Sequence, residues 1–399
     1  MFNPIMKPSR REITPAERLT KLPPYLFAEI DRIKRDLIAQ GKDVIDLGVG
    51  DPDLPTPDYI VEALRQAAGD PANHRYALDQ GMPEFRRAIS EWYKRRFGVH
   101  LDPDREVLPL LGSKEGIGHV FLALVNPKDL VLVPDPGYPV YKSGTWFAGG
   151  EPHLVPLIEE NNYLVDLNAV GEGILRRAKL LFINYPNNPT ASCATKEFFA
   201  HTVKQAREFG FLVCHDAAYT EIAFDGYEAP SFLQADGARE VGIEFHSLSK
   251  TFNMTGWRIG FACGNAKILE LLAKVKSNLD SGIFQAVQWA GVKALTAGRD
   301  EAKKNSKIYE RRRNLLVDGL NSLGWRVPKP KATFYVWAPV PPGYTSQELT
   351  AKLLKEAGIV VTPGNGFGIN GEGYFRMSLT INEERLREAV TRIKNLHSK

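Results

Sequence analysis

The chain has 399 residues, of which 43% are hydrophobic and 25% are charged, and its formal net charge at pH 7 is +4. These values are typical of a soluble globular protein large enough for two domains, and the small, mixed charge argues against nucleic acid or an anionic membrane as a partner. The three cysteines form no C-x-x-C pair, so neither a disulfide framework nor a zinc site is expected, and no metal is predicted.

The first 57 residues are predicted to form an N-terminal arm that also completes part of a small domain. Basic residues near the start are not followed by an apolar segment, and no apolar run reaches the length of a membrane span. We therefore expect a cytoplasmic protein without a secretory signal. The elements predicted here are a helix over residues 26–38, a short strand over 44–47 and a glycine- and proline-rich loop over 48–57.

Residues 58–290 alternate between strand and helix patterns. Apolar strand-like segments separated by helices indicate a mostly parallel sheet that is covered by helices on both faces. Pro83 suits the first turn of a helix, and Gly98 and Gly210 suit C-terminal stops. The expected strands are 107–111, 131–133, 180–183, 211–214 and 243–245, and the expected helices are 83–97, 112–125 and 196–209.

Residues 291–399 are predicted to form a smaller α+β domain. A long basic helix begins this part of the chain, and shorter strands and helices follow it. The expected elements are a helix over 300–323, a strand over 333–337, a helix over 346–357, a loop over 363–368, a strand over 374–379 and a helix over 383–395.

Polar and aromatic residues follow four of the predicted strands. Ligands bind beyond the carboxyl ends of the strands in a doubly wound sheet, so these residues are expected to meet at one site. Each of them alone has a structural explanation, such as a helix cap, a turn or a core position, but four groups in register with a lysine favour a site. They are Tyr138 after 131–133, Asn188 after 180–183, Asp216 and Tyr219 after 211–214, and Ser247, Ser249 and Lys250 after 243–245.

Lys250 follows the hydroxyl residues Ser247 and Ser249, and Arg258 stands eight residues further on. A lysine amine can bind a carbonyl cofactor covalently, and serines with an arginine can hold a phosphate; together these abilities match pyridoxal phosphate. A carboxylate such as Asp216 would keep the pyridine nitrogen protonated. An amide and a phenol would bond the 3′ oxygen, and an aromatic face would stack on the ring.

Two further segments suit a phosphate and a carboxylate. Residues 112–116 open a predicted helix, whose free N–H groups suit a phosphate, with Ser113 and Lys114 as candidates. They lack the G-x-G-x-x-G and P-loop spacings, which argues against a nucleotide site; a plain glycine turn is the alternative. Arg376 suits bidentate recognition of a carboxylate, and an exposed strand arginine is the alternative.

At this point the residues match a family. Asn188-Pro189-Thr190, Asp216-x-x-Tyr219, Ser247-x-Ser249-Lys250 and Arg258 occur in the order found in pyridoxal-phosphate aminotransferases of class I/II, and the chain resembles them over about residues 20–395. The family usually has glycine after Asn-Pro-Thr, where Ala191 stands here. The resemblance implies an α/β protein of fold type I. Its large cofactor-binding domain would carry a mostly parallel seven-stranded sheet flanked by helices, and a smaller α+β domain would accompany it. The predicted bounds are 1–57 for the arm and part of the small domain, 58–290 for the large domain and 291–399 for the small C-terminal domain.

The resemblance also implies roles for individual residues. Lys250, as the Schiff-base lysine and proton shuttle, is catalytic together with Asp216 and Tyr219. Substrate contacts would come from Tyr25, Gly50, Asn188 and Arg376, the last for the α-carboxylate. Tyr76 would reach the phosphate of a neighbouring subunit, which implies a homodimer with shared active sites. The implied cofactor contacts are Tyr76, Ser113, Lys114, Tyr138, Asn188, Asp216, Tyr219, Ser247, Ser249, Lys250 and Arg258.

Within the family, the chain looks most like the LL-diaminopimelate aminotransferases, which implies amino transfer between LL-2,6-diaminopimelate and 2-oxoglutarate in lysine biosynthesis. The alternative is an aspartate, alanine or aromatic aminotransferase, or a related β-lyase. The effector domain of a transcriptional regulator would need an N-terminal DNA-binding domain, which about twenty residues cannot supply. A nucleotide-binding Rossmann protein is disfavoured because the glycine fingerprint is absent.

Overall fold

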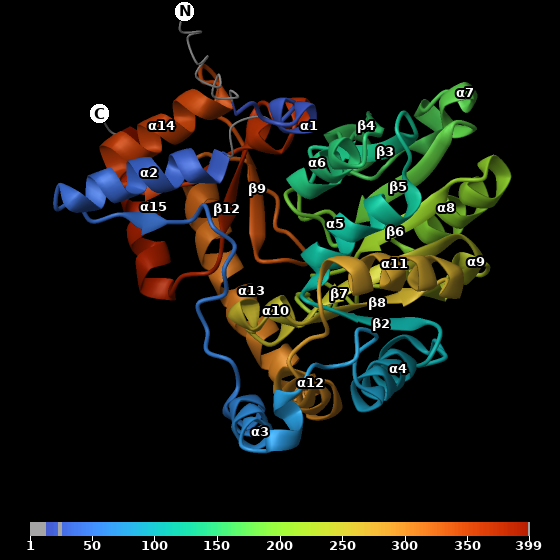
Figure 1. Cartoon of the computed structure of the whole chain (residues 1–399). Helices are drawn as coiled ribbons and strands as arrows, with labels where there is room; N and C mark the ends of the chain where they lie inside the picture. Colours follow the sequence, from blue (N-terminus) through green and yellow to red (C-terminus); the bar gives the residue numbers. More distant parts are fainter. Residues whose placement is uncertain (1–12, 23–25, 398–399) are drawn as a thin grey trace, which may run out of the picture.

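A large central sheet dominates the computed structural model, which describes residues 13–22 and 26–397 (Figure 1). Its strands are β2 (Val107–Leu110), β3 (Leu130–Asp135), β4 (Glu151–Pro156), β5 (Ala178–Asn184), β6 (Leu212–Asp216), β7 (Gly242–Ser247) and β8 (Gly260–Gly264). Within the described residues these seven strands lie in the order β2-β8-β7-β6-β5-β3-β4. β8 runs antiparallel to β2 and β7 and the other neighbours are parallel, so the predicted mostly parallel sheet is confirmed.

The strands in the middle of this sheet end close to one another. Asn184 at the end of β5 pairs with Asp216 at the end of β6, and Asp216 pairs in turn with Phe245 of β7. Parallel strands place their carboxyl ends at the same edge of a sheet, where ligands bind in this class of fold. The register therefore brings the segments that follow β5, β6 and β7 together.

Both faces of the sheet are buried, which explains why the sequences of its strands are nearly continuous apolar runs. In β5, Leu180 and Phe182 pack with Phe121 of α5 (Ser113–Leu124), whereas Leu181 and Ile183 pack into the cluster on the opposite face. The helices that follow or flank the strands are α3 (Asp58–Ala68), α4 (Pro83–Phe97), α5 (Ser113–Leu124), α6 (Pro139–Phe147), α8 (Lys196–Phe209), α11 (Ala266–Leu279) and α12 (Gln285–Ala297).

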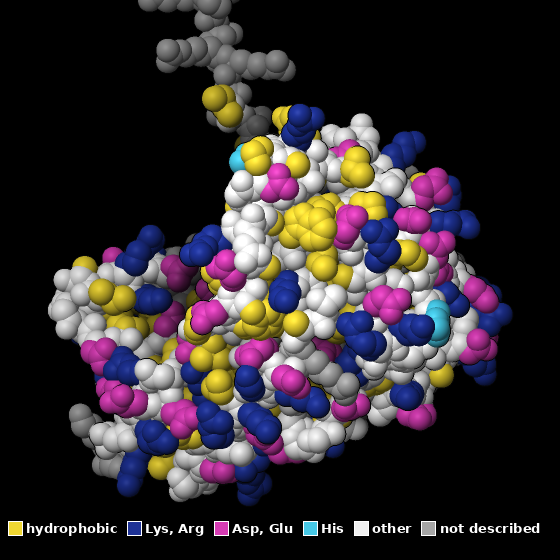
Figure 2. Space-filling model, turned by 90° about the horizontal axis from the view of Figure 1, so that it is seen from below, with side chains coloured by type: hydrophobic (Ala, Val, Ile, Leu, Met, Phe, Trp, Pro, Cys, Tyr) yellow, Lys and Arg dark blue, Asp and Glu magenta, His cyan; other side chains and the backbone are white. Residues whose placement is uncertain are grey.

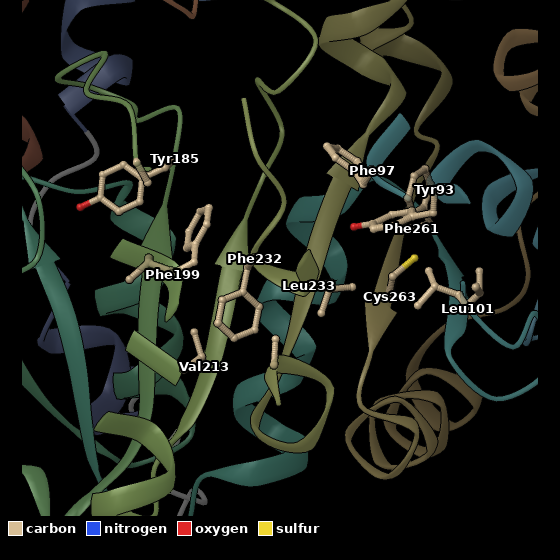
Figure 3. Packing of buried hydrophobic residues seen from close by; sticks show 14 of the residues in the cluster. Tyr93, Phe97, Leu101, Tyr185, Phe199, Val213, Phe232, Leu233, Phe261 and Cys263 are labelled. Carbon is tan, nitrogen blue, oxygen red and sulfur yellow. The ribbon is translucent and has the colours of Figure 1, made fainter. Parts of the chain in front are cut away.

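An aromatic group joins α4 to this core (Figure 3). Tyr93 and Phe97 lie with ring centres 5.2 Å apart, and Tyr93 lies 6.4 Å from Phe261 of β8. The helix has the predicted bounds: Pro83 occupies its first turn, and Gly98 ends it in the left-handed region with φ of 71°. Burial of these rings fixes α4 against the sheet.

A second unit contains most of the C-terminal residues. Its three-stranded antiparallel sheet has the order β11 (Thr362–Pro363), β12 (Tyr374–Ser378) and β9 (Tyr335–Pro339). Its own hydrophobic cluster includes Phe334, Leu353 and Leu386. The helices of this unit are α13 (Arg299–Ser322), α14 (Ser346–Ala357) and α15 (Glu383–His397).

An N-terminal segment joins this second unit. β1 (Ile45–Asp46) pairs in parallel with β10 (Ile359–Val360). Helix α2 (Leu26–Ala39) lies near α14 in Figure 1, and Leu37 of α2 packs with Leu354 of α14. The predicted domain bounds at residues 57 and 290 stay a prediction.

Several predicted elements differ from those observed. The strands predicted over 211–214 and 243–245 extend further, so Asp216 and Ser247 lie at strand ends rather than after them. The predicted loop over 363–368 contains a 3-10 turn, Gly364–Phe367. The elements that were not predicted from the sequence include α3, α6, α11, α12, β4 and β8. Among the described residues, no helix combines the length and apolar character needed to cross a membrane.

Candidate active site

A cavity of about 400 Å³ lies beyond the carboxyl ends of the central strands. Most of the predicted site residues line this one cavity, although they come from segments far apart in the sequence. The predicted residues that line it are Gly50, Ser113, Lys114, Tyr138, Asn188, Asp216, Tyr219, Ser247, Ser249, Lys250, Arg258 and Arg376.

Lys250 sits on the short helix α10 (Leu248–Thr251), directly after β7. The Ser247 hydroxyl caps this helix by accepting from the backbone N–H of Ser249 at 3.2 Å. The Lys250 Nζ donates to the Gly50 carbonyl at 3.2 Å. Burial lowers the pKa of the Lys250 ammonium to about 8, although the nearby Asp51 carboxylate raises it. A pKa near 8 leaves about a tenth of this amine neutral and nucleophilic at pH 7, far more than for an ordinary lysine.

Asp216 ends β6 with its carboxylate buried. Its Oδ2 accepts from the Tyr141 hydroxyl at 2.8 Å, but its Oδ1, also buried, has no hydrogen-bond partner among the described residues. Burial raises the pKa of this carboxyl, while the Tyr141 hydroxyl and His215 lower it. A buried oxygen without a donor is costly, so this atom fits a ligand that brings an N–H, such as a protonated pyridine nitrogen.

Arg376 lies in β12 and is only 2% exposed, which excludes the alternative of an exposed strand arginine. Its Nη1 donates to the Asn188 Oδ1 and its Nη2 to the Gly48 carbonyl, both at 2.7 Å. Burial lowers the pKa of the guanidinium. The contact with Asn188 joins the C-terminal sheet to the turn after β5, so the two units meet at the cavity.

The start of α5 and Arg258 form a basic corner of the cavity. Gly112 precedes the helix with φ of 82°, and a Cβ there would lie 2.6 Å from the Arg258 Nη2. Glycine is therefore required for the guanidinium to lie against the helix start, beside Ser113 and Lys114. Free backbone N–H groups, two basic side chains and nearby serines suit a phosphate.

The predicted tyrosines lie in different environments. Tyr219 is buried, and burial together with the neighbouring Tyr335 raises its pKa well above the ordinary value. Tyr138 is half-buried just before α6, with the Lys114 Nζ 6.0 Å from its ring centre. Tyr76 is 93% exposed and does not line the cavity of its own chain. Tyr25 lies outside the described residues.

The turn after β5 carries a position that is strained. Ala191 has φ of 59°, in the left-handed region that favours glycine. The residue that departs from the family's Asn-Pro-Thr-Gly pattern thus retains a glycine-like backbone. Asn184 secures the same turn: its Nδ2 donates to the Asp216 carbonyl at 2.7 Å, and its Oδ1 accepts from the Asn188 N–H at 2.8 Å.

Some residues that line the cavity or support its lining were not predicted from the sequence. Tyr335 and Phe367 flank Arg376, Asn184 supports the turn, and Tyr141 bonds Asp216. For Tyr335 a signal existed, because it lies in a predicted strand whose alternating residues share one face. Tyr141 is a buried helix residue, and no local pattern distinguishes it from core.

A cluster outside the cavity has metal-like spacing. Ligand atoms of Glu115, His119 and Asp280 lie within 4.8 Å of one another. The Lys276 Nζ lies 2.7 Å from the Asp280 Oδ1 and 3.7 Å from the Glu115 Oε1. This ammonium already supplies positive charge to both carboxylates, so the group is explained as an ion-pair network.

Comparison with known proteins agrees with this geometry. Residues 42–393 match the family model described as aminotransferase class I and II. An LL-diaminopimelate aminotransferase of Desulforudis audaxviator is 59% identical over 95% of this chain and 97% of its own length. One from Moorella thermoacetica is 55% identical over 96% and 98%.

Solved structures agree at the level of the fold. Apo-BacF from Bacillus subtilis superposes with a TM-score of 0.93 at 42% identity, covering 97% of this chain and 98% of its own. A double mutant of Thermus thermophilus aspartate aminotransferase has a TM-score of 0.91 at 31% identity, covering 96% and 100%. The chain therefore belongs to the class I and II aminotransferases, and its cofactor is pyridoxal 5′-phosphate.

Proposed function

We propose that the protein transfers an amino group between LL-2,6-diaminopimelate and 2-oxoglutarate, so that glutamate forms and the other product cyclises to tetrahydrodipicolinate in lysine biosynthesis. One observation carries the chemistry: a nucleophilic lysine, an unpartnered aspartate oxygen and a buried arginine line the same cavity. Relatives named LL-diaminopimelate aminotransferase, at 52–59% identity over nearly the whole chain, support the choice of substrate.

When bound, pyridoxal phosphate supplies an electron sink for negative charge at the substrate Cα. In our proposal, the Asp216 Oδ1 would accept a hydrogen bond from the pyridine N–H of the cofactor. Asn188 and Tyr219 would bond the cofactor's 3′ oxygen. Tyr138 covers a face of the ring. The phosphate is held by Ser113, Lys114, Ser247, Ser249 and Arg258.

Lys250 performs the proton transfer in this proposal. Its Nζ would hold the cofactor covalently when no substrate is bound. As a free amine in the presence of substrate, the Nζ would take the proton from the substrate Cα and return it on the cofactor side. Arg376 binds the α-carboxylate near Gly50, and this fixes the Cα proton in reach of the amine.

The pKa of Lys250 predicts how the apoenzyme captures its cofactor. Only the neutral amine is nucleophilic, so the rate of capture should rise as the pH increases through about 8 and then level off. An ordinary lysine amine, with a pKa of about 10.4, would give a rate still rising above pH 9. Stopped-flow absorbance of apoenzyme mixed with pyridoxal phosphate measures this profile. A midpoint near the ordinary value would contradict the buried environment assigned to Lys250.

The visible spectrum of the holoenzyme tests the proposed substrate. LL-diaminopimelate added without a keto acid should bleach the visible band, and 2-oxoglutarate should restore it. A holoenzyme that ignores LL-diaminopimelate but bleaches with aspartate or alanine would retain the chemistry and exclude the proposed role. Release of pyruvate instead of amino transfer would identify a β-lyase.

We further propose a homodimer whose partner supplies Tyr76 to the cavity. Large hydrophobic side chains are exposed near this residue in the sequence and before α12: Leu78 is 65% exposed, Leu279 60% and Phe284 46%. Figure 2 shows hydrophobic side chains gathered among charged ones on the face seen from below. Large hydrophobic side chains that are exposed together on one face favour a protein–protein interface there. Light scattering should give twice the 44.5 kDa chain mass, and a monomeric active enzyme would exclude shared sites.

A further inference from the structure

Tyr335 contacts two of the proposed site residues at once. It lies in β9, is 3% exposed and lines the cavity. We propose that Tyr335 is a positioning residue with two separable actions: its ring orients Arg376 for the substrate carboxylate, and its hydroxyl strengthens Tyr219 as a donor to the cofactor. This inference rests on the proposed function, because it acts through residues to which that function gives roles.

The ring action follows from the geometry of the three-stranded sheet. Arg376 pairs with Trp337 across β12 and β9, and Ser378 pairs with Tyr335, so Arg376 and Tyr335 are diagonal neighbours on one face. The guanidinium carbon lies 4.1 Å from the Tyr335 ring centre and 4.7 Å from that of Phe367. Two aromatic rings therefore hold the planar guanidinium, and its orientation sets where a carboxylate can bind.

The hydroxyl action follows from a contact between the two units. The Tyr335 hydroxyl lies 3.2 Å from the Tyr219 hydroxyl, and either oxygen could be the donor. When Tyr219 donates its proton to a ligand oxygen, its own oxygen is free to accept from Tyr335. Hydrogen bonds in such a chain polarise one another, so Tyr335 makes Tyr219 the stronger donor.

The loop after β1 holds the Tyr335 phenol in place. A Cβ at Gly50 would lie 2.0 Å from the Tyr335 Oη and 2.6 Å from its Cζ, so the backbone packs directly on the phenol. The same Gly50 provides the carbonyl that accepts from the Lys250 Nζ. The titratable groups that face Tyr335 are Tyr219, Arg376 and Tyr309. Phenylalanine fits this space, since it removes one atom and keeps the ring.

Two variants of the holoenzyme separate the actions. Tyr335→Phe retains the ring over Arg376, so KM for LL-diaminopimelate and 2-oxoglutarate should stay within about twofold. Loss of the hydroxyl should lower kcat about fivefold and move the pH midpoint of the visible band upward by about half a unit, because a weaker Tyr219 donor leaves more negative charge on the ring oxygen. Tyr335→Leu removes the ring and should also raise both KM values about tenfold.

Tyr374→Phe is the matched control. It removes a tyrosine hydroxyl from the neighbouring strand, where the Tyr374 hydroxyl donates to Glu159 at the surface. Its kinetics and visible band should match those of the unmodified enzyme. The inference is overturned if Tyr335→Phe leaves both kcat and the pH midpoint of the visible band unchanged. It is also overturned if Tyr335→Phe raises KM tenfold although thermal unfolding shows that the variant is folded. A failure of the proposed function is distinct, because the unmodified enzyme would then ignore LL-diaminopimelate.

Discussion

Replacement of Lys250 by alanine should reduce turnover by at least about 10³-fold while the protein remains folded. The Nζ is the buried amine that we expect both to bind the cofactor and to move the Cα proton, and alanine supplies neither function. Burial disfavours the charged ammonium, so the alanine apoprotein should unfold at an equal or higher temperature at pH 7. Steady-state transamination and thermal unfolding measure the two expectations.

Lys204→Ala is the control for this change. Lys204 is exposed in the middle of α8, where alanine is a favourable helix residue, so activity should not change. Turnover by the Lys250→Ala enzyme above a hundredth of the original rate would contradict the role assigned to this lysine. A variant that loses its cooperative unfolding transition would show a structural defect instead. In that case Lys250→Arg, which keeps a positive charge, would separate the effect of losing the charge from the effect of losing the proton transfer.

Replacement of Asp216 by asparagine should lower kcat by about 10³-fold and weaken cofactor binding about tenfold. Asparagine has nearly the same shape, but it is neutral, so it lacks the negative charge that would keep the pyridine nitrogen protonated. The Oδ1 of Asp216 is buried without a partner among the described residues, so the neutral amide should leave the apoprotein equally or more stable. Cofactor titration, kinetics and thermal unfolding of the apoprotein test these effects.

A surface aspartate gives the comparison for this variant. Asp318 pairs with Lys329 at 2.8 Å, with its side chain 60% exposed, and Asp318→Asn should change neither activity nor cofactor affinity. An Asp216→Asn enzyme that binds the cofactor as tightly as the original would show that the Oδ1 does not face a cationic N–H. Equal kcat values would exclude the aspartate from the electron-sink chemistry.

The meeting of several polar residues beyond the carboxyl ends of the central strands was largely predictable from the sequence. Lys250, Asp216 and Asn188 follow apolar runs that alternate with helix patterns, which indicates parallel strands, and such a fold brings the strand ends to one edge. The helix bounds of α4, α8 and α14 were predictable for a local reason, because proline, threonine and glycine mark their ends. Local signals and a rule of topology were sufficient for these features.

Other features depend on contacts that no local pattern contains. Tyr335 contacts Tyr219 and Arg376, which are distant in sequence and belong to other strands or loops. From the sequence, Tyr141 is indistinguishable from an ordinary core residue, and only the structure shows that its hydroxyl donates to Asp216. β8 runs antiparallel to β7, and an apolar run alone does not reveal the direction of its strand.

The pairing of β1 with β10 affects when a newly synthesised chain can form its carboxylate-binding pocket. Ile45 pairs with Ile359, the Gly48 carbonyl accepts from Arg376, and about 300 residues separate these partners. At a typical synthesis rate the early segment waits roughly 15 to 60 s for its partner to leave the ribosome. The large sheet is complete at residue 264, well before that moment. A nascent chain with this sheet already folded would therefore lack its carboxylate-binding pocket until translation is almost finished.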